Sequence, residues 1–134
     1  FSNFHKWFND PKNGYIDGYN VDKDVIVKGN KTYSPMTCCF LPPDINKVIS
    51  KSRGNRKLPI GVKPLPSKRY EAVCRKNNKD CYLGTFDTVL EAFNAYKTAK
   101  EKYIKELAEK YFQEGKITER VYNALMKYEV EITD

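Results

Sequence analysis

The sequence predicts an α+β fold: a three-stranded antiparallel sheet packed on a long helix, preceded by a small irregular ββα-like segment and followed by a short helix. Two observations carry this prediction. Residues 70–86, YEAVCRKNNKDCYLGTF, alternate apolar and polar side chains on both sides of Asn77-Asn78, as the two arms of a hairpin do. From Val89 to about Phe112, apolar side chains recur every three or four positions, which is the spacing of one helix face.

The first fifty residues hold short elements between turn-forming residues. Proline is tolerated in the first turn of a helix and Asp44 favours a helix amino end, so PPDINKVISK is predicted to be helical. Before it we expect, in order, a short helix with Phe1, Phe4 and Phe8 on one face, an irregular stretch over 9–20, a strand at Val25–Val27 and a second apolar run at Cys38–Leu41.

The predicted hairpin separates two kinds of side chain. Asparagine tolerates the positive φ of a two-residue hairpin turn, so Asn77-Asn78 is the predicted turn. The pairing then sets Lys76 opposite Lys79, Arg75 opposite Asp80, Cys74 opposite Cys81 and Val73 opposite Tyr82. Because strand side chains alternate between faces, one side holds Tyr70, Ala72, Cys74, Cys81 and Leu83, and the other holds Glu71, Val73, Arg75, Asp80 and Tyr82. The first side is the predicted core, and the second is a surface available for function.

Local signals place the elements around this hairpin. The first strand of the three-stranded sheet, which precedes the hairpin, is expected near Ile60 to Lys63. Thr88 and Glu91 form the Thr-x-x-Glu pattern of a helix start, and Gly115 is placed to end the long helix. We expect that helix to pack on the sheet through Phe93, Tyr96 and Leu107.

The carboxy-terminal residues predict two further elements. ITERVYNALMKY has the pattern of a second amphipathic helix, and the tail YEVEITD alternates like a short edge strand. The residues of the second helix that should point inward are Ile117, Val121, Leu125 and Tyr128.

Composition favours a polyanionic partner. Net charge is +7, from 24 Lys and Arg against 17 Asp and Glu, and 13% of the residues are aromatic. Lysine and arginine neutralise phosphates, and aromatic rings add apolar contact or stacking. No apolar stretch approaches the length of a membrane span and no charged-then-apolar leader opens the sequence, so we expect a cytoplasmic protein without a membrane partner.

The cysteines do not indicate a zinc site. Cys38, Cys39, Cys74 and Cys81 lack paired C-x-x-C spacing, and His5 is the sole histidine. Cys74 and Cys81 face each other across the predicted hairpin, a position that could permit a disulfide. In a cytosolic protein we expect all four as reduced, small core residues.

Small and basic residues suggest a boundary between two parts of the chain. SKSRGNR contains Gly, Ser and three cations, a composition typical of a linker. We therefore predict an amino-terminal segment over 1–50, a linker over 51–57 and a carboxy-terminal domain over 58–134.

The carboxy-terminal pattern resembles a known family. GV near the first strand, YEAVCR in the second, YLGTFDT leading to the helix and EAFNAY within it resemble the APETALA/ethylene-response-factor type of DNA-binding domain, over about Ile60 to Ile104. This resemblance implies that the sheet lies in the major groove of duplex DNA and needs no cofactor. It places DNA contacts on Lys63, Lys68, Arg69, Arg75 and Tyr82. In such a complex we expect Lys76 and Lys79, beside the hairpin turn, to contact the DNA backbone. Lys63 and Ile60 stand where the family has arginines, and Ser67 where tryptophan is common.

The amino-terminal motifs VDKD, GNK, YSP and TCCFLPPDIN resemble the HNH-like segment that precedes this domain in phage and mobile-element homing endonucleases. A ββα-metal site needs a histidine to activate water and a metal held by the first strand and the following helix. Lys23 occupies the histidine's place, and Asp22, Asp24 and Asn46 remain as ligands for magnesium. Lysine is no ordinary base at neutral pH, so we expect Asp22, Lys23 and Asn46 to be a remnant rather than a working nuclease.

Three functions follow from these resemblances. The first is the duplex-DNA-binding module of a phage-type homing endonuclease, acting in a bacterial or phage-infected cell. The second is a metal-dependent HNH-like endonuclease. The third is a phage inhibitor that uses the same surface against a host nuclease. The sequence indicates neither the DNA target nor the oligomeric state.

Overall fold

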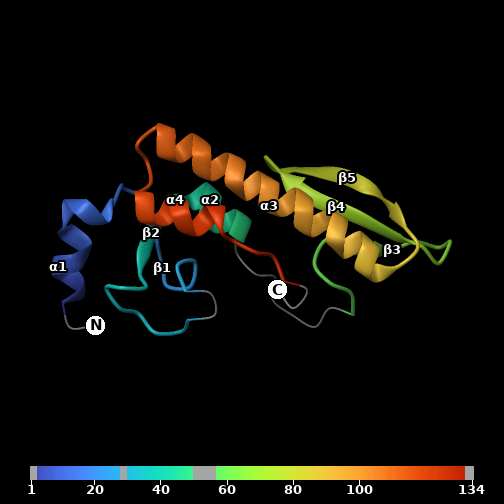
Figure 1. The fold of residues 1–134 in the computed structure, drawn as a ribbon, viewed down its shortest axis with the longest axis horizontal. Coiled ribbons are helices and arrows are strands. Elements are labelled where there is room, and N and C mark those ends of the chain that lie inside the picture. The colour runs from blue at the N-terminus through green and yellow to red at the C-terminus, as the bar shows by residue number, and fades with distance from the viewer. Residues whose placement is uncertain (1–2, 28–29, 50–56, 132–134) are drawn as a thin grey trace. The chain divides into compact units, whose positions relative to one another are not determined.

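The computed structural model describes residues 3–27, 30–49 and 57–131. It confirms the predicted α+β fold class, because a three-stranded antiparallel sheet packs on the long helix α3 and the short helix α4 follows (Figure 1). Helix α3 spans Val89–Gln113 and α4 spans Glu119–Met126. The sheet contains β3 (Val62–Pro64), β4 (Tyr70–Lys76) and β5 (Lys79–Phe86) in the order β3-β4-β5.

The chain divides into two compact units. One contains residues 1–50 and 104–128, and the other contains residues 51–103 and 129–134. Helix α3 thus contributes to both units. The domain limits inferred from the sequence, 1–50, 51–57 and 58–134, concern independent folding and stay a prediction. Residues 51–56 of the predicted linker lie outside the described residues.

The hairpin forms with the predicted register and turn. The four predicted pairs, from Lys76 with Lys79 to Val73 with Tyr82, are all present. Asn77 and Asn78 have φ values of 53° and 62°, as a two-residue turn requires. Beyond Val73 the register shifts, so that Ala72 pairs with Gly84 and Leu83 is the extra residue of a bulge.

Strand β3 begins later than predicted. Ile60 and Gly61 lie in a turn, and the strand starts at Val62. The φ of Gly61 is 79°, a left-handed value that suits glycine and interrupts extended backbone. A methyl group at this position would lie 2.1 Å from Cδ2 of Tyr96, so the turn also packs closely on α3.

The long helix begins and ends where the sequence predicts. The backbone N–H of Glu91 donates to Oγ1 of Thr88 over 3.2 Å. At the other end, Gly115 has a φ of 70° and the N–H of Lys116 donates to the carbonyl of Tyr111 over 2.9 Å. These contacts satisfy backbone groups that a helix leaves unpaired at its ends.

The second helix completes a core in the first unit. Thr118 caps α4 by accepting a hydrogen bond from the N–H of Val121. The core is a cluster of buried apolar side chains from β2 (Cys39–Leu41), α2 (Pro43–Ile49), α3, α4 and two connecting segments. Its members are Val25, Cys39, Leu41, Ile45, Ile49, Ile104, Ala108, Ile117, Val121 and Leu125, and Tyr128 packs against it as predicted. Leu107 packs against this cluster, so the expectation that it lies at the sheet is wrong.

Short elements form the rest of the first unit. They are α1 (Phe4–Asn9), a 3-10 turn η1 (Pro11–Asn13), β1 (Asn20–Asp22), β2 (Cys39–Leu41) and α2 (Pro43–Ile49). Strands β1 and β2 pair antiparallel, with Asp22 opposite Cys39. A second small cluster contains Trp7, Cys38 and Phe40, in which the rings of Trp7 and Phe40 stack with centroids 4.8 Å apart.

Two predicted strands do not form within the described residues, and residues 132–134 of the predicted tail strand lie outside them. Residues 25–27 form bends rather than a strand, because the Asp22 carboxylate accepts hydrogen bonds from the N–H groups of Asp24 and Val25 and turns the chain. The described part of the tail, residues 128–131, has no strand pairing. Instead, Val130 donates its N–H to Glu101 over 2.8 Å and accepts from Lys97 over 2.9 Å. Among the described residues, no helix combines the length and apolar character that crossing a membrane requires.

Candidate nucleic-acid interface

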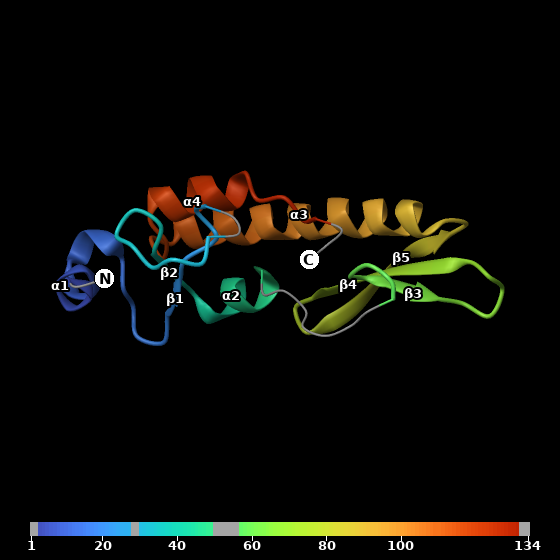
Figure 2. The same ribbon diagram turned by 90° about the horizontal axis from the view of Figure 1, so that it is seen from below.

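The two faces of the sheet have different surroundings. On one face, Ala72 pairs with Val62 and Gly84, and both Ala72 and Val62 are buried. Figure 2 shows the amino-terminal half of α3 covering one side of the sheet, where its residues Phe93 and Tyr96 are each 4% exposed. The other face carries the pairs of Lys63 with Glu71, Val73 with Tyr82 and Arg75 with Asp80, and it is the open face.

The sheet and its connecting turns carry an excess of positive charge. Residues 57–87 contain seven Lys and Arg against three Asp and Glu. Over the whole second unit, residues 51–103 and 129–134, there are 13 cations against eight anions, which accounts for most of the net charge of +7. The unit with the sheet is therefore the more basic of the two.

Two arginines of the sheet have acidic partners on the surface. Arg69 Nε lies 2.9 Å from Asp87 Oδ1, and Arg75 Nη1 lies 3.4 Å from Asp80 Oδ1. Both pairs are solvent-exposed, so each contributes only about 0 to 1 kcal/mol to stability. Either guanidinium can exchange its carboxylate for a phosphate or a base edge at low cost.

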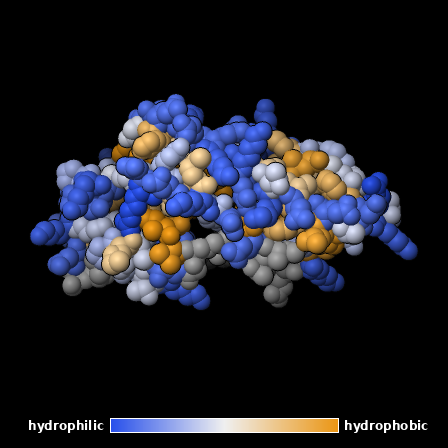
Figure 3. Space-filling model, viewed as in Figure 1, coloured by the Kyte–Doolittle hydropathy of each residue, from blue (hydrophilic) through white to orange (hydrophobic). Residues whose placement is uncertain are grey.

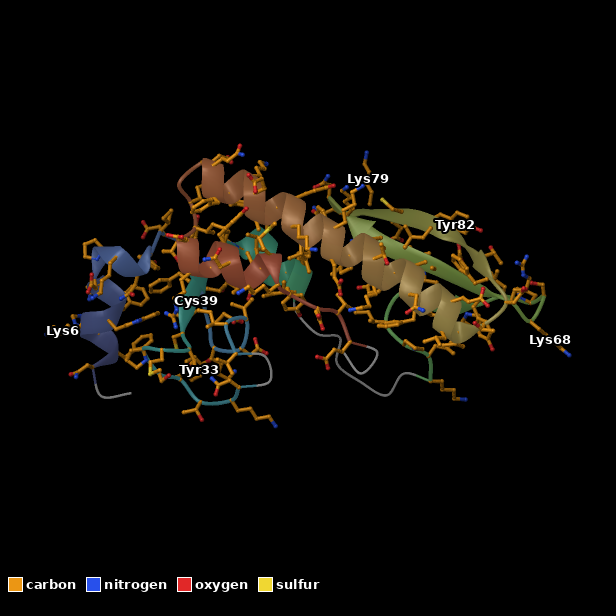
Figure 4. All side chains as sticks on the ribbon, in the orientation of Figure 1. Lys6, Tyr33, Cys39, Lys68, Lys79 and Tyr82 are labelled. Carbon is orange, nitrogen blue, oxygen red and sulfur yellow. The ribbon has the colours of Figure 1, made fainter. Side chains whose placement is uncertain are left out.

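Three lysines stand out from the sheet without acidic partners among the described residues. Lys63 is exposed on β3, Lys79 is exposed at the start of β5, and Lys68 is exposed in the β3–β4 turn with a φ of 65°. Figure 4 shows Lys68 and Lys79 near opposite ends of the sheet, with Tyr82 between them. Tyr82 is 61% exposed, and its hydroxyl contacts Oγ1 of Thr85.

The hairpin turn is fixed to the helix. The N–H of Asn77 donates to the Tyr103 hydroxyl over 3.3 Å, and that hydroxyl donates to Oδ1 of Asn77 over 3.1 Å. The Lys76 ammonium lies 5.3 Å from the centre of the Tyr103 ring. Lys76 therefore points to the helix side, unlike Arg75, which lies on the open face. Tyr103 has the spacing of the apolar helix stripe, and that spacing gives no sign of the polar contact between its hydroxyl and the turn.

The amino-terminal candidates lie in the other unit. Strands β1 and β2 followed by α2 give a ββα order of elements. Asp22 ends β1, and its Oδ2 accepts from the N–H groups of Asp24, over 3.0 Å, and Val25, over 2.7 Å. Burial raises the pKa of the Asp22 carboxyl and nearby Asp24 adds to the increase, while these two amides oppose it. The structure thus gives Asp22 a turn-forming contact.

Lys23 and Asn46, the other two residues of the predicted remnant, have different surroundings. The Lys23 ammonium lies 5.1 Å from the centre of the Tyr33 ring, and Asn46 is half-buried on α2. Within residues 3–27, 30–49 and 57–131, no group of three His, Cys, Asp or Glu side chains converges so that it could hold a metal ion. The metal assignment of Asp22, Asp24 and Asn46 stays a prediction.

Comparison with protein-family models, with curated proteins and with solved structures finds no match. Figure 3 shows one face of the molecule, on which hydrophilic side chains predominate and hydrophobic patches are small and separate.

Proposed function

We propose that this protein binds duplex DNA through the open face of the sheet β3-β4-β5. The observation that carries the proposal is the asymmetry of the sheet, since α3 covers one face and the other presents exposed Lys63, Arg75 and Tyr82. A two-stranded or three-stranded ribbon with basic side chains fits the major groove, which is about 12 Å wide. Net positive charge favours association with DNA regardless of the DNA sequence.

The exposed basic and aromatic residues of the sheet differ in the contact they can make, and Lys79, which pairs with Lys76, lies beside the hairpin turn rather than on the open face. Lys63, Lys68 and Lys79 are flexible point charges suited to phosphates. Arg75 presents a planar fork that can donate two hydrogen bonds to a guanine edge, and Arg69, just before β4, can do the same or bind a phosphate. Tyr82 has an apolar ring suited to a sugar or a thymine methyl.

The test compares duplex affinities of three variants by fluorescence anisotropy. Arg75→Ala and Lys63→Ala should each weaken binding. Lys102→Ala, an exposed position on α3, is the matched control and should leave affinity unchanged. Lys97 is unsuitable as the control, because its ammonium holds Glu101 and the carbonyl of Val130. Equal affinities for all three variants would refute the proposed face.

Salt dependence then separates phosphate contacts from base contacts. Log affinity falls with log salt by about 0.9 for each phosphate neutralised on duplex DNA, so loss of one such contact reduces the slope by that amount. Loss of a base contact costs about 1 to 3 kcal/mol on a preferred site and much less on random sequence. We expect Lys63→Ala to behave in the first way and Arg75→Ala in the second.

A metal-dependent HNH-like endonuclease is the second candidate. The ββα order of β1, β2 and α2 favours it, whereas Lys23 in the histidine's place opposes it. The full chain with plasmid DNA and magnesium should give no nicked product. The nuclease would be the better assignment if the chain nicks the plasmid and the double variant Asp22→Asn, Asn46→Ala does not. The melting temperature of the double variant must equal that of the unaltered chain.

In either case, we propose that the chain belongs to the phage-type homing endonuclease class of DNA-targeting proteins. The sheet would supply target binding, and the segment that contains β1, β2 and α2 would be the nuclease part, either as a remnant or as a working site. Duplex binding by the sheet would support this assignment without requiring catalysis.

A further inference from the structure

Two cysteine thiols lie opposite each other in the sheet. Cys74 on β4 and Cys81 on β5 are register partners, and both are free. Directly opposed residues in antiparallel strands have Cα atoms about 4.5 to 5.5 Å apart. Disulfides form at Cα separations of about 4.4 to 6.8 Å, so the two cysteines can be joined without a change of register.

The two thiols differ in their access to solvent. Cys74 is 3% exposed, whereas Cys81 is only half-buried. A small oxidant in solution therefore reaches Cys81 more readily. Cys74 lies beside it as a protected second thiol.

Positive charge surrounds the protected thiol. Burial raises the pKa of the Cys74 thiol, and the ammonium groups of Lys100 and Lys76 oppose this increase. Lys100 lies on α3, and burial lowers its pKa while the Cys74 sulfur opposes that decrease. Because the thiolate is the nucleophilic form of cysteine, these cations favour the form that attacks a second sulfur.

We propose that Cys74 and Cys81 are a redox-active dithiol, which hydrogen peroxide converts into a cross-strand disulfide. The Cys81 thiolate attacks a peroxide oxygen, the O–O bond breaks, and the released hydroxide takes up a proton and leaves as water. The Cys74 thiolate then attacks the sulfur of the Cys81 sulfenic acid, the S–O bond breaks, and hydroxide again leaves as water. The two thiols together lose two electrons and two protons, and one peroxide becomes two water molecules. This site is independent of the proposed DNA binding.

Peptide mapping of the full chain tests the proposal. The protein is treated with hydrogen peroxide, denatured, blocked with iodoacetamide, digested with trypsin and analysed by mass spectrometry. We expect linked peptides that join Cys74 to Cys81 and separate on reduction, while Cys38 and Cys39, both buried in the other unit, carry the blocking group. Blocking of Cys74 and Cys81 to the same extent as Cys38 and Cys39 would overturn the proposal.

Variants test the order of the two steps. In Cys74→Ser the sulfenic acid on Cys81 has no second thiol to react with, so dimedone should label Cys81. In Cys81→Ser, Cys74 should stay unlabelled. Dimedone on Cys74 rather than Cys81 would contradict the proposed order. The map of the unaltered chain remains decisive if a variant fails to fold.

The role of Lys100 has its own readout. Lys100→Met should slow disulfide formation, because it removes the ammonium group that opposes the increase in the pKa of the Cys74 thiol. Lys102→Met, an exposed lysine on the same helix, is the matched control and should not change the rate. Equal rates for the two variants would show that Lys100 does not assist the reaction.

Discussion

Replacing Gly61 with alanine tests how closely the turn before β3 packs on α3. The φ of Gly61 is 79°, and a Cβ there would lie 2.1 Å from Cδ2 of Tyr96, a ring that is 4% exposed and has little room to move. A left-handed φ costs an alanine about 1 to 2 kcal/mol. Overpacking a core costs about 1 to 3 kcal/mol more. We therefore expect Gly61→Ala to lower the free energy of unfolding by about 2 to 5 kcal/mol.

Urea unfolding followed by far-ultraviolet circular dichroism measures this loss. Gly18→Ala is the matched control, because Gly18 also has a positive φ, of 89°, but no described heavy atom lies within 4 Å of its built Cβ. The control should show only the backbone cost of about 1 to 2 kcal/mol. If Gly61→Ala is no more destabilising than Gly18→Ala, the contact between Gly61 and Tyr96 does not stabilise the fold.

Three further predictions concern α3. Phe93→Ala should destabilise by about 3 to 5 kcal/mol, whereas Leu90→Ala, 59% exposed on the same helix, should change stability by less than about 0.5 kcal/mol in the same urea assay. Tyr103→Phe removes the hydrogen bonds to the hairpin turn and should cost about 1 kcal/mol; an unchanged urea midpoint would rule out that anchor. Burial and the hydrogen bond to Asp44 raise the pKa of Tyr111 to about 12 from 10.0, so its contribution is complete below pH 10.0 and is lost as the pH rises to about 12. Melting temperatures over this range should fall less steeply for Tyr111→Phe, and parallel curves would contradict the assignment.

Local chemistry explains which features of the fold the sequence predicts. The turn at Asn77-Asn78 and the cap at Thr88 depend on neighbours within three residues, and both form as predicted. Once the turn is known, alternation fixes the two faces of the hairpin. The fold class follows because one apolar helix stripe and one apolar sheet face must cover each other.

Features that depend on distant residues escaped prediction. The Val25–Val27 run is apolar enough for a strand, but no described strand pairs with it and it follows the turn formed by Asp22. The tail residue Val130 finds hydrogen-bond partners on α3 instead of a strand. Leu107 continues the helix stripe, yet it packs on a different cluster because α3 contributes to two units.

The candidate site likewise contains contacts between distant residues that the sequence does not predict. Alternation of side chains along the two strands is sufficient to assign Arg75 and Tyr82 to the open face. It does not indicate that Arg69 pairs with Asp87, which follows it by 18 residues, or that Lys76 packs over the Tyr103 ring. Such contacts depend on how the ends of the sheet meet α3, and they determine which cations are available to a ligand.

The most direct test of DNA binding through the open face of the sheet is an NMR titration of the isotope-labelled chain with a short DNA duplex. Backbone amide signals of open-face residues, including Lys63, Arg75 and Tyr82, should shift progressively and saturate with duplex concentration. Signals from exposed α3 positions such as Leu90 and Lys102 should move little. Shifts confined to α3, or none at DNA concentrations that saturate anisotropy, would contradict binding through the sheet.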